Sequence, residues 1–131
     1  MKATSQQKYS GILLLDKPLG MTSHQAVGFL RRKLQMKQIG HAGTLDPMAT
    51  GLLILMVGKA TKTSQYLVLD NKVYQGTIKL GEVSNTYDTE GTITTVADPS
   101  QLTKEAIENA ALSLSGKQLQ LPPMFSAVKI N

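Results

Sequence analysis

The chain has 131 residues, 41% of them hydrophobic, which is enough for a single domain with a buried core. It contains no cysteine, which excludes disulfide bonds and thiolate metal sites, and none of its apolar runs approaches the roughly 20 residues that span a bilayer. The formal net charge of +5 favours a polyanionic partner. The polar segment 1–10 lacks the apolar stretch of a signal peptide, so we expect a cytoplasmic protein.

The N-terminal part of the chain predicts a strand followed by a helix. Residues 12–15 form an apolar run typical of a buried strand, and the segment 17–20, with its proline and glycine, ends it. Thr22 followed three residues later by Gln25 forms a capping box, which predicts a helix start. The apolar residues of this helix recur on one face: Val27, Leu30 and Leu34. We expect Gly40 to close the helical region.

The middle of the chain predicts further strands. The fully apolar run 52–57 indicates a central strand, and residues 60–69 favour one or two helical turns. Residues 73–80 alternate in polarity and predict a third strand. A polar loop over 81–91 then leads to the β-rich run 92–96, which we expect to pair with that strand as a long hairpin.

The C-terminal part predicts one more helix and one more strand. Thr103 begins a helix that Gly116 ends, and residues 124–130 favour a strand. The apolar stripe of this helix consists of Ile107, Ala110, Ala111 and Leu114. The sequence therefore predicts one α+β domain with a mixed, mainly antiparallel sheet and flanking helices.

The segment 40–51, with the sequence GHAGTLDPMATG, places one carboxylate, Asp46, in a loop rich in glycine and proline ahead of the apolar run. Such a loop can present a carboxylate to a ligand at the rim of a sheet. The alternative is an aspartate that bonds nearby backbone amides in a turn. A phosphate-binding loop does not fit, because here the glycines follow a helix and precede a strand. A metal site is not expected either, since His41 and Asp46 lack further ligands and His24 is the other histidine of the chain.

The whole segment around this loop resembles the TruB family, the bacterial tRNA pseudouridine-55 synthases. The matching motifs are LDKPLGMTS at 15–23, the loop segment 40–51, GKATKTSQY at 58–66 and KVY at 72–74. The resemblance implies the pseudouridine-synthase fold, tRNA with its T-loop as the partner, and a reaction that needs no cofactor and no metal.

The resemblance also implies the roles of three residues. Asp46 matches the catalytic aspartate, which either acts on ribose C1′ or removes a ribose proton. His41 matches the histidine that contacts the displaced nucleotide, and Tyr74 matches the tyrosine that packs on the uracil ring. Taken alone, a loop histidine is more often structural, and a tyrosine in an alternating run is more often a core residue.

Further residues are expected to support the loop or contact RNA. Lys17 is expected to shape the aspartate loop rather than perform chemistry, and Gly43 and Thr44 belong to that loop. Lys62 is either a contact to the tRNA backbone or a solvated lysine. The same two alternatives stay open for the basic residues of the first predicted helix: Arg31, Arg32, Lys33 and Lys37.

The end of the chain at Asn131 directly follows a strand-like segment, so we expect residues 1–131 to be the N-terminal part of a longer catalytic domain. The resemblance implies that an arginine partner of the aspartate and further pocket residues lie beyond it, and that the full-length enzyme is a monomer. A non-catalytic tRNA-binding module and an inactive fragment are the alternative functions.

Overall fold

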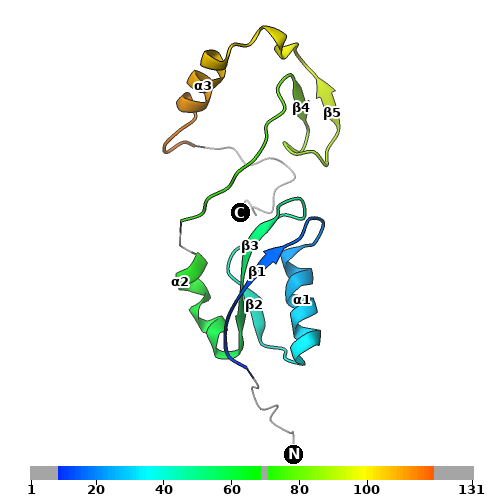
Figure 1. Cartoon of the computed structure of the whole chain (residues 1–131), viewed down its shortest axis with the longest axis vertical. Helices are drawn as coiled ribbons and strands as arrows, with labels where there is room; N and C mark the ends of the chain where they lie inside the picture. The colour runs from blue at the N-terminus through cyan, green and yellow to red at the C-terminus, as the bar shows by residue number, and fades with distance from the viewer. Residues whose placement is uncertain (1–8, 69–70, 120–131) are drawn as a thin grey trace, which may run out of the picture. The chain divides into compact units, whose positions relative to one another are not determined.

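The computed structural model describes residues 9–68 and 71–119, and it separates the chain into two compact units, Met1–Val73 and Tyr74–Asn131 (Figure 1). The sequence predicted one domain without an internal boundary.

The first unit contains a three-stranded antiparallel sheet. Its strands are β1 (Gly11–Lys17), β2 (Ile39–His41) and β3 (Gly51–Val57), in the order β1-β3-β2. β3 is therefore the central strand, as its uninterrupted apolar sequence predicted. In the register, Lys17 at the end of β1 pairs with Gly51 at the start of β3, which places the end of β1 beside the loop that leads into β3.

The helix α1 (Ser23–Leu34) begins at the predicted capping box. The Thr22 hydroxyl accepts from the Gln25 amide at 3.0 Å, and the Gln25 side chain accepts from the Thr22 amide at 2.8 Å. The predicted end at Gly40 is wrong. Gln35, with a left-handed backbone at φ 53°, ends the helix, and Gly40 lies in β2. The left-handed cap turns the chain back early enough for β2 to reach the sheet.

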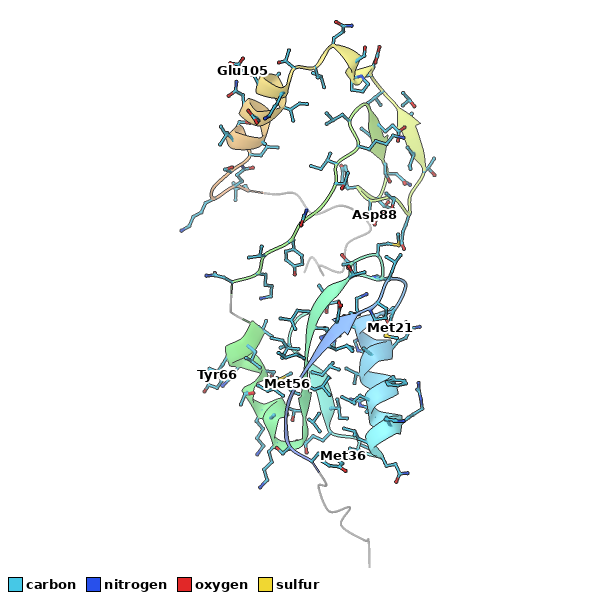
Figure 2. The ribbon with its side chains drawn as sticks, viewed as in Figure 1. Met21, Met36, Met56, Tyr66, Asp88 and Glu105 are labelled. Carbon is cyan, nitrogen blue, oxygen red and sulfur yellow. The ribbon has the colours of Figure 1, made fainter. Side chains whose placement is uncertain are left out.

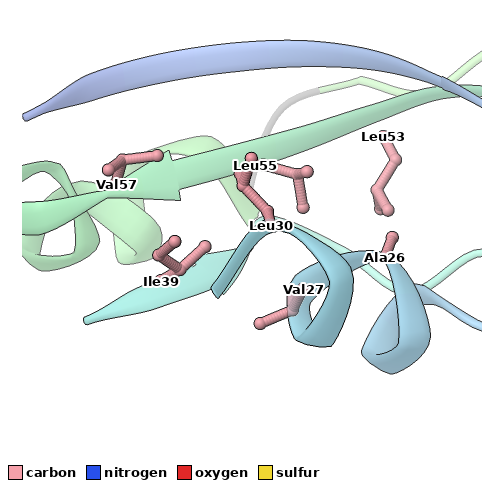
Figure 3. Packing of buried hydrophobic residues seen from close by; sticks show 7 residues of the cluster. All are labelled: Ala26, Val27, Leu30, Ile39, Leu53, Leu55 and Val57. Carbon is pink, nitrogen blue, oxygen red and sulfur yellow. The ribbon is translucent and has the colours of Figure 1, made fainter. Parts of the chain in front are cut away.

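The core of this unit lies between α1 and one face of the sheet. Figure 3 shows side chains of β3 pointing toward the helix, with Leu53 above Ala26 and Leu55 beside Leu30. The buried cluster consists of Ala26, Val27, Leu30, Ile39, Leu53, Leu55 and Val57. Met21 and Met36, which lie near the two ends of α1 in Figure 2, pack against this cluster.

The two positions Leu55 and Leu52 provide a direct test of this packing, because they are 1% and 62% exposed on the same strand. We expect Leu55→Ala to lower the free energy of unfolding by about 2–5 kcal/mol, since it leaves a cavity in the core. Leu52→Ala is the matched control, with an expected change of about 0.5 kcal/mol. Urea unfolding of both variants measures the difference, and equal losses would contradict the assigned packing.

Short helical segments follow β3 in the first unit, as the sequence predicted for residues 60–69. They are η1 (Gly58–Thr63), a 3-10 helix, and α2 (Ser64–Val68). Tyr66 on α2 is 70% exposed, so this segment forms a surface rather than part of the core.

The predicted strand over 73–80 is wrong, because the structure gives this segment no strand pairing. Val73 and Ile78 are 98% and 85% exposed. A strand needs a partner for its backbone hydrogen bonds, and among the described residues this segment has none. The hairpin instead joins β4 (Glu82–Ser84), within the predicted polar loop, to β5 (Ile93–Thr95).

The β4–β5 connection is held by local hydrogen bonds around Asp88, labelled in Figure 2. Its carboxylate accepts from the Thr86 hydroxyl and from the Glu90 amide. These bonds favour the ionised form and hold the pKa of Asp88 below its usual value. The polar residues between β4 and β5 therefore close a turn.

The helix α3 (Lys104–Ser113) begins as predicted at Thr103, whose hydroxyl accepts from the Ala106 amide at 3.2 Å. Its apolar stripe is not buried in the structure, and Ile107 is 40% exposed. The predicted strand 124–130 lies outside the described residues. In the ranges described, no helix has the length and apolar character needed to cross a membrane.

Candidate active-site loop

The loop 42–50, between β2 and β3, carries the predicted catalytic carboxylate. Gly43 has a φ of +95°, a conformation that favours glycine. Further along, the Ala49 amide donates to the Asp46 carbonyl at 3.0 Å, which closes a β-turn with Pro47 at its second position. Proline at this position pre-sets the turn, and aspartate is common at its first position. The local sequence therefore explains why Asp46 stands at the entry of a tight turn.

The Asp46 side chain is exposed, and among the described residues no hydrogen bond or ion pair to its carboxylate is recorded. The alternative interpretation of the sequence, an aspartate bonded to nearby amides, is therefore not what the structure shows. Within the described ranges, both carboxylate oxygens are therefore available to a ligand, and the loop backbone sets the position from which the side chain projects.

Lys17 holds the loop on the C-terminal side of Asp46. This side chain is fully buried, and its ammonium donates to the carbonyls of Pro18 at 3.0 Å, Met21 at 2.7 Å and Pro47 at 3.4 Å. The Gly20 amide donates to the same Pro47 carbonyl at 2.8 Å. These contacts are consistent with the predicted supporting role, which stays a prediction.

Ser23 holds the loop on the other side of Asp46, and the sequence analysis missed it. Its hydroxyl donates to the Leu45 carbonyl at 3.0 Å and accepts from the Leu45 amide at 2.9 Å. The side chain is only 1% exposed. The sequence singled out Thr22 as the helix cap, and no local pattern indicated that the next residue bonds to a loop 22 residues away.

His41 stands at the start of the loop, and its ring is fixed from two sides. Nδ1 lies 2.7 Å from the Gly43 carbonyl, which can only accept, so Nδ1 carries the proton and Nε2 is left for other partners. The ring of His24, from the start of α1, lies nearly perpendicular to it, with centroids 5.5 Å apart and an interplanar angle of 80°. His24 was not predicted to belong to the site.

The other predicted site residues are not joined to Asp46 by any recorded contact. Thr44 is an exposed loop residue. Lys62 is exposed on η1, without a recorded bond in the part of the chain that the structure describes. Tyr74 is 67% exposed and belongs to the second unit. Their roles stay predictions. Within the described ranges, no three side chains of histidine, aspartate or glutamate gather in a way that could hold a metal ion.

The basic residues of α1 differ in their contacts. Arg31 donates to the Ile39 carbonyl at 2.7 Å and so joins the end of α1 to β2. Arg32 and Lys33 on α1 are exposed without a recorded hydrogen bond among the described residues, and so is Lys37, which follows the helix instead of belonging to it as predicted. Cations in the last turn of a helix also stabilise its C-terminus, so the structure explains Arg31 without RNA. For Arg32, Lys33 and Lys37, a contact to the tRNA backbone and a solvated side chain both stay open.

Comparison with known proteins decides the family. The model of the TruB family pseudouridylate synthase (N terminal domain) matches residues 31–131. The chain belongs to the TruB family. A tRNA pseudouridine synthase B of Opitutus terrae is 50% identical over 126 residues, which cover 96% of this chain and 52% of the relative. The protein of the same name from Syntrophotalea carbinolica is 45% identical over 92% of this chain and 39% of the relative.

A solved structure supports the same fold. A Cbf5-Nop10-Gar1 complex contains a chain that is 28% identical, with a TM-score of 0.61 over 91% of this chain and 31% of the other. The predicted pseudouridine-synthase-like fold is therefore confirmed. The chain spans about half or less of the length of these two tRNA pseudouridine synthase B relatives. The residues that match the TruB family model, 31–131, include His41 and Asp46 of the loop, whereas Lys17 and Ser23 lie before the matched range.

Proposed function

We propose that the full-length protein converts uridine to pseudouridine in the T-loop of tRNA, as a monomer in the cytoplasm, with Asp46 as the catalytic carboxylate. The observation that supports this most is the exposed Asp46 side chain, without a recorded partner among the described residues, on a loop held from both sides in a TruB-family chain. Relatives named tRNA pseudouridine synthase B support the choice of tRNA.

The reaction is an isomerisation at one nucleotide. The bond between ribose C1′ and uracil N1 breaks, the base rotates, C1′ bonds to C5, and the C5 proton leaves while N1 gains one. An ionised Asp46 can serve as the nucleophile at C1′ or as the base that removes a ribose proton. Oxidation states balance without a redox partner, so no cofactor is required. The uridine must leave its stack before Asp46 can reach the sugar.

Three further residues would hold the nucleotide during this rotation. His41 offers Nε2 and a ring face to the displaced nucleotide, because Gly43 already accepts from Nδ1. We assign Tyr74 to stacking on the uracil ring and Lys62 to the tRNA backbone, both on the resemblance of their motifs. Removing one phosphate contact at Lys62 would lower the salt dependence of tRNA binding by about one unit of slope.

The test uses the full-length protein and tRNA labelled with tritium at uracil C5. We expect tritium to be released in step with pseudouridine formation, and no release from a tRNA whose T-loop target is cytidine. The exposed basic residues of α1 favour a second candidate, a non-catalytic tRNA-binding module. Salt-sensitive tRNA binding without tritium release would support that candidate and overturn the proposed enzyme.

A further inference from the structure

We propose that Ser23 is a positioning residue for the reaction, acting on Asp46 through Leu45. This inference rests on the proposed function. Ser23 is the first residue of α1, yet its hydroxyl bonds to the loop 42–50 rather than to its own helix. It therefore connects the start of a core helix to the residue directly before the carboxylate.

The two hydrogen bonds fix the backbone on both sides of Leu45. Its amide belongs to the peptide plane shared with Thr44, and its carbonyl belongs to the plane shared with Asp46. Because peptide groups are planar, a hydrogen bond that holds the Leu45 carbonyl also holds the direction of the Asp46 N–H. Rotation of the Leu45–Asp46 peptide, which would move the Asp46 Cα, is thereby limited. On the other side, Lys17 and the Gly20 amide hold the Pro47 carbonyl. Asp46 thus lies between two fixed backbone positions.

The chemistry of serine suits this position. A hydroxyl donates one hydrogen bond and accepts others, so a single side chain can satisfy both the carbonyl and the amide of Leu45. At 1% exposure, Ser23 is shielded from solvent, so the protein rather than water satisfies these two groups of Leu45. Leu45 itself packs against the core cluster, so the loop is joined to the core by apolar and polar contacts together.

A role confined to the start of α1 is the competing explanation, and Thr22 separates the two. Thr22 is the neighbouring hydroxyl residue and forms the capping box, but it has no recorded contact to the loop. Loss of the Thr22 hydroxyl therefore weakens the helix start alone. Loss of the Ser23 hydroxyl also frees the Leu45–Asp46 peptide.

The experiment compares Ser23→Ala with Thr22→Ala in the full-length protein, with tritium release and tRNA binding measured at a temperature where both variants are folded. We expect Thr22→Ala to lower Tm and leave kcat within twofold of the wild type. We expect Ser23→Ala to lower kcat about 10- to 100-fold, with KM and the Kd for tRNA within twofold, because a displacement of about 1 Å at a reacting group has effects of this size.

Three outcomes would overturn the proposal: an unchanged kcat in Ser23→Ala, a loss confined to KM, or an equal loss of kcat in both variants. If Ser23→Ala does not fold, Ser23→Cys fills the site with a weaker hydrogen-bonding group and carries the same test, with reduced kcat expected. Failure of the proposed function is seen separately, as a wild-type protein that releases no tritium.

Discussion

Asp46→Asn in the full-length protein is expected to reduce pseudouridine formation by about 10²–10⁴-fold or more, because an amide can neither act as the nucleophile nor accept the ribose proton. The Asp46 side chain has no recorded bond in the described residues, so within residues 9–68 and 71–119 the substitution removes no contact that stabilises the loop. We therefore expect Tm and the Kd for tRNA to stay close to the wild-type values. Single-turnover tritium release measures the loss.

Asp16→Asn is the matched control for this experiment. Asp16 lies on β1 of the same unit, is exposed, and undergoes the same change of charge. We expect it to keep wild-type turnover. Full activity in Asp46→Asn would show that another group performs the chemistry, and equal losses in the two variants would point to net charge rather than to the position of the carboxylate.

The sequence predicted those parts of the fold that local chemistry determines. The capping box at Thr22 fixed the start of α1, because both of its hydrogen bonds lie within one turn. The apolar run of β3 predicted a central strand, since a strand with consecutive buried residues, here Leu55, Met56 and Val57, tolerates few polar residues. The position of Asp46 in a turn followed from Pro47 and the flanking glycines, whose backbone preferences act over two or three residues.

The remaining features depend on contacts between distant segments. β2 has three residues, too few for an alternating pattern, and it exists because β3 offers it an edge. The segment 73–80 alternates in polarity as a strand does, but it pairs with no other strand among the described residues. The alternating pattern alone was therefore not enough to predict a strand. Ser23 was missed for the same reason, since its partner Leu45 is 22 residues away and a buried serine has no sequence signature.

Lys17 shows how strongly the loop depends on such distant contacts. A buried ammonium must satisfy its donors, and here three backbone carbonyls take them, one of which belongs to Pro47 in the aspartate turn. No carboxylate is recorded within ion-pair distance of it among the described residues. The Lys17 ammonium therefore binds backbone carbonyls from three positions of the chain, Pro18, Met21 and Pro47.

Lys17→Met is expected to lower the free energy of unfolding by about 2–4 kcal/mol, because methionine fills much of the space but removes the ammonium donor from all three carbonyls, of which Pro47 alone keeps the Gly20 amide as a donor. Lys33→Met is the matched control: Lys33 is exposed on α1, so we expect a change of about 0.5 kcal/mol or less. Urea unfolding of the full-length protein measures both. We also expect tritium release by Lys17→Met to fall below the wild-type value, since the Pro47 carbonyl loses one of its two donors. A Lys17→Met protein as stable as Lys33→Met and as active as the wild type would mean that the turn is held by the Gly20 amide and the Ser23 hydroxyl without help from the buried charge.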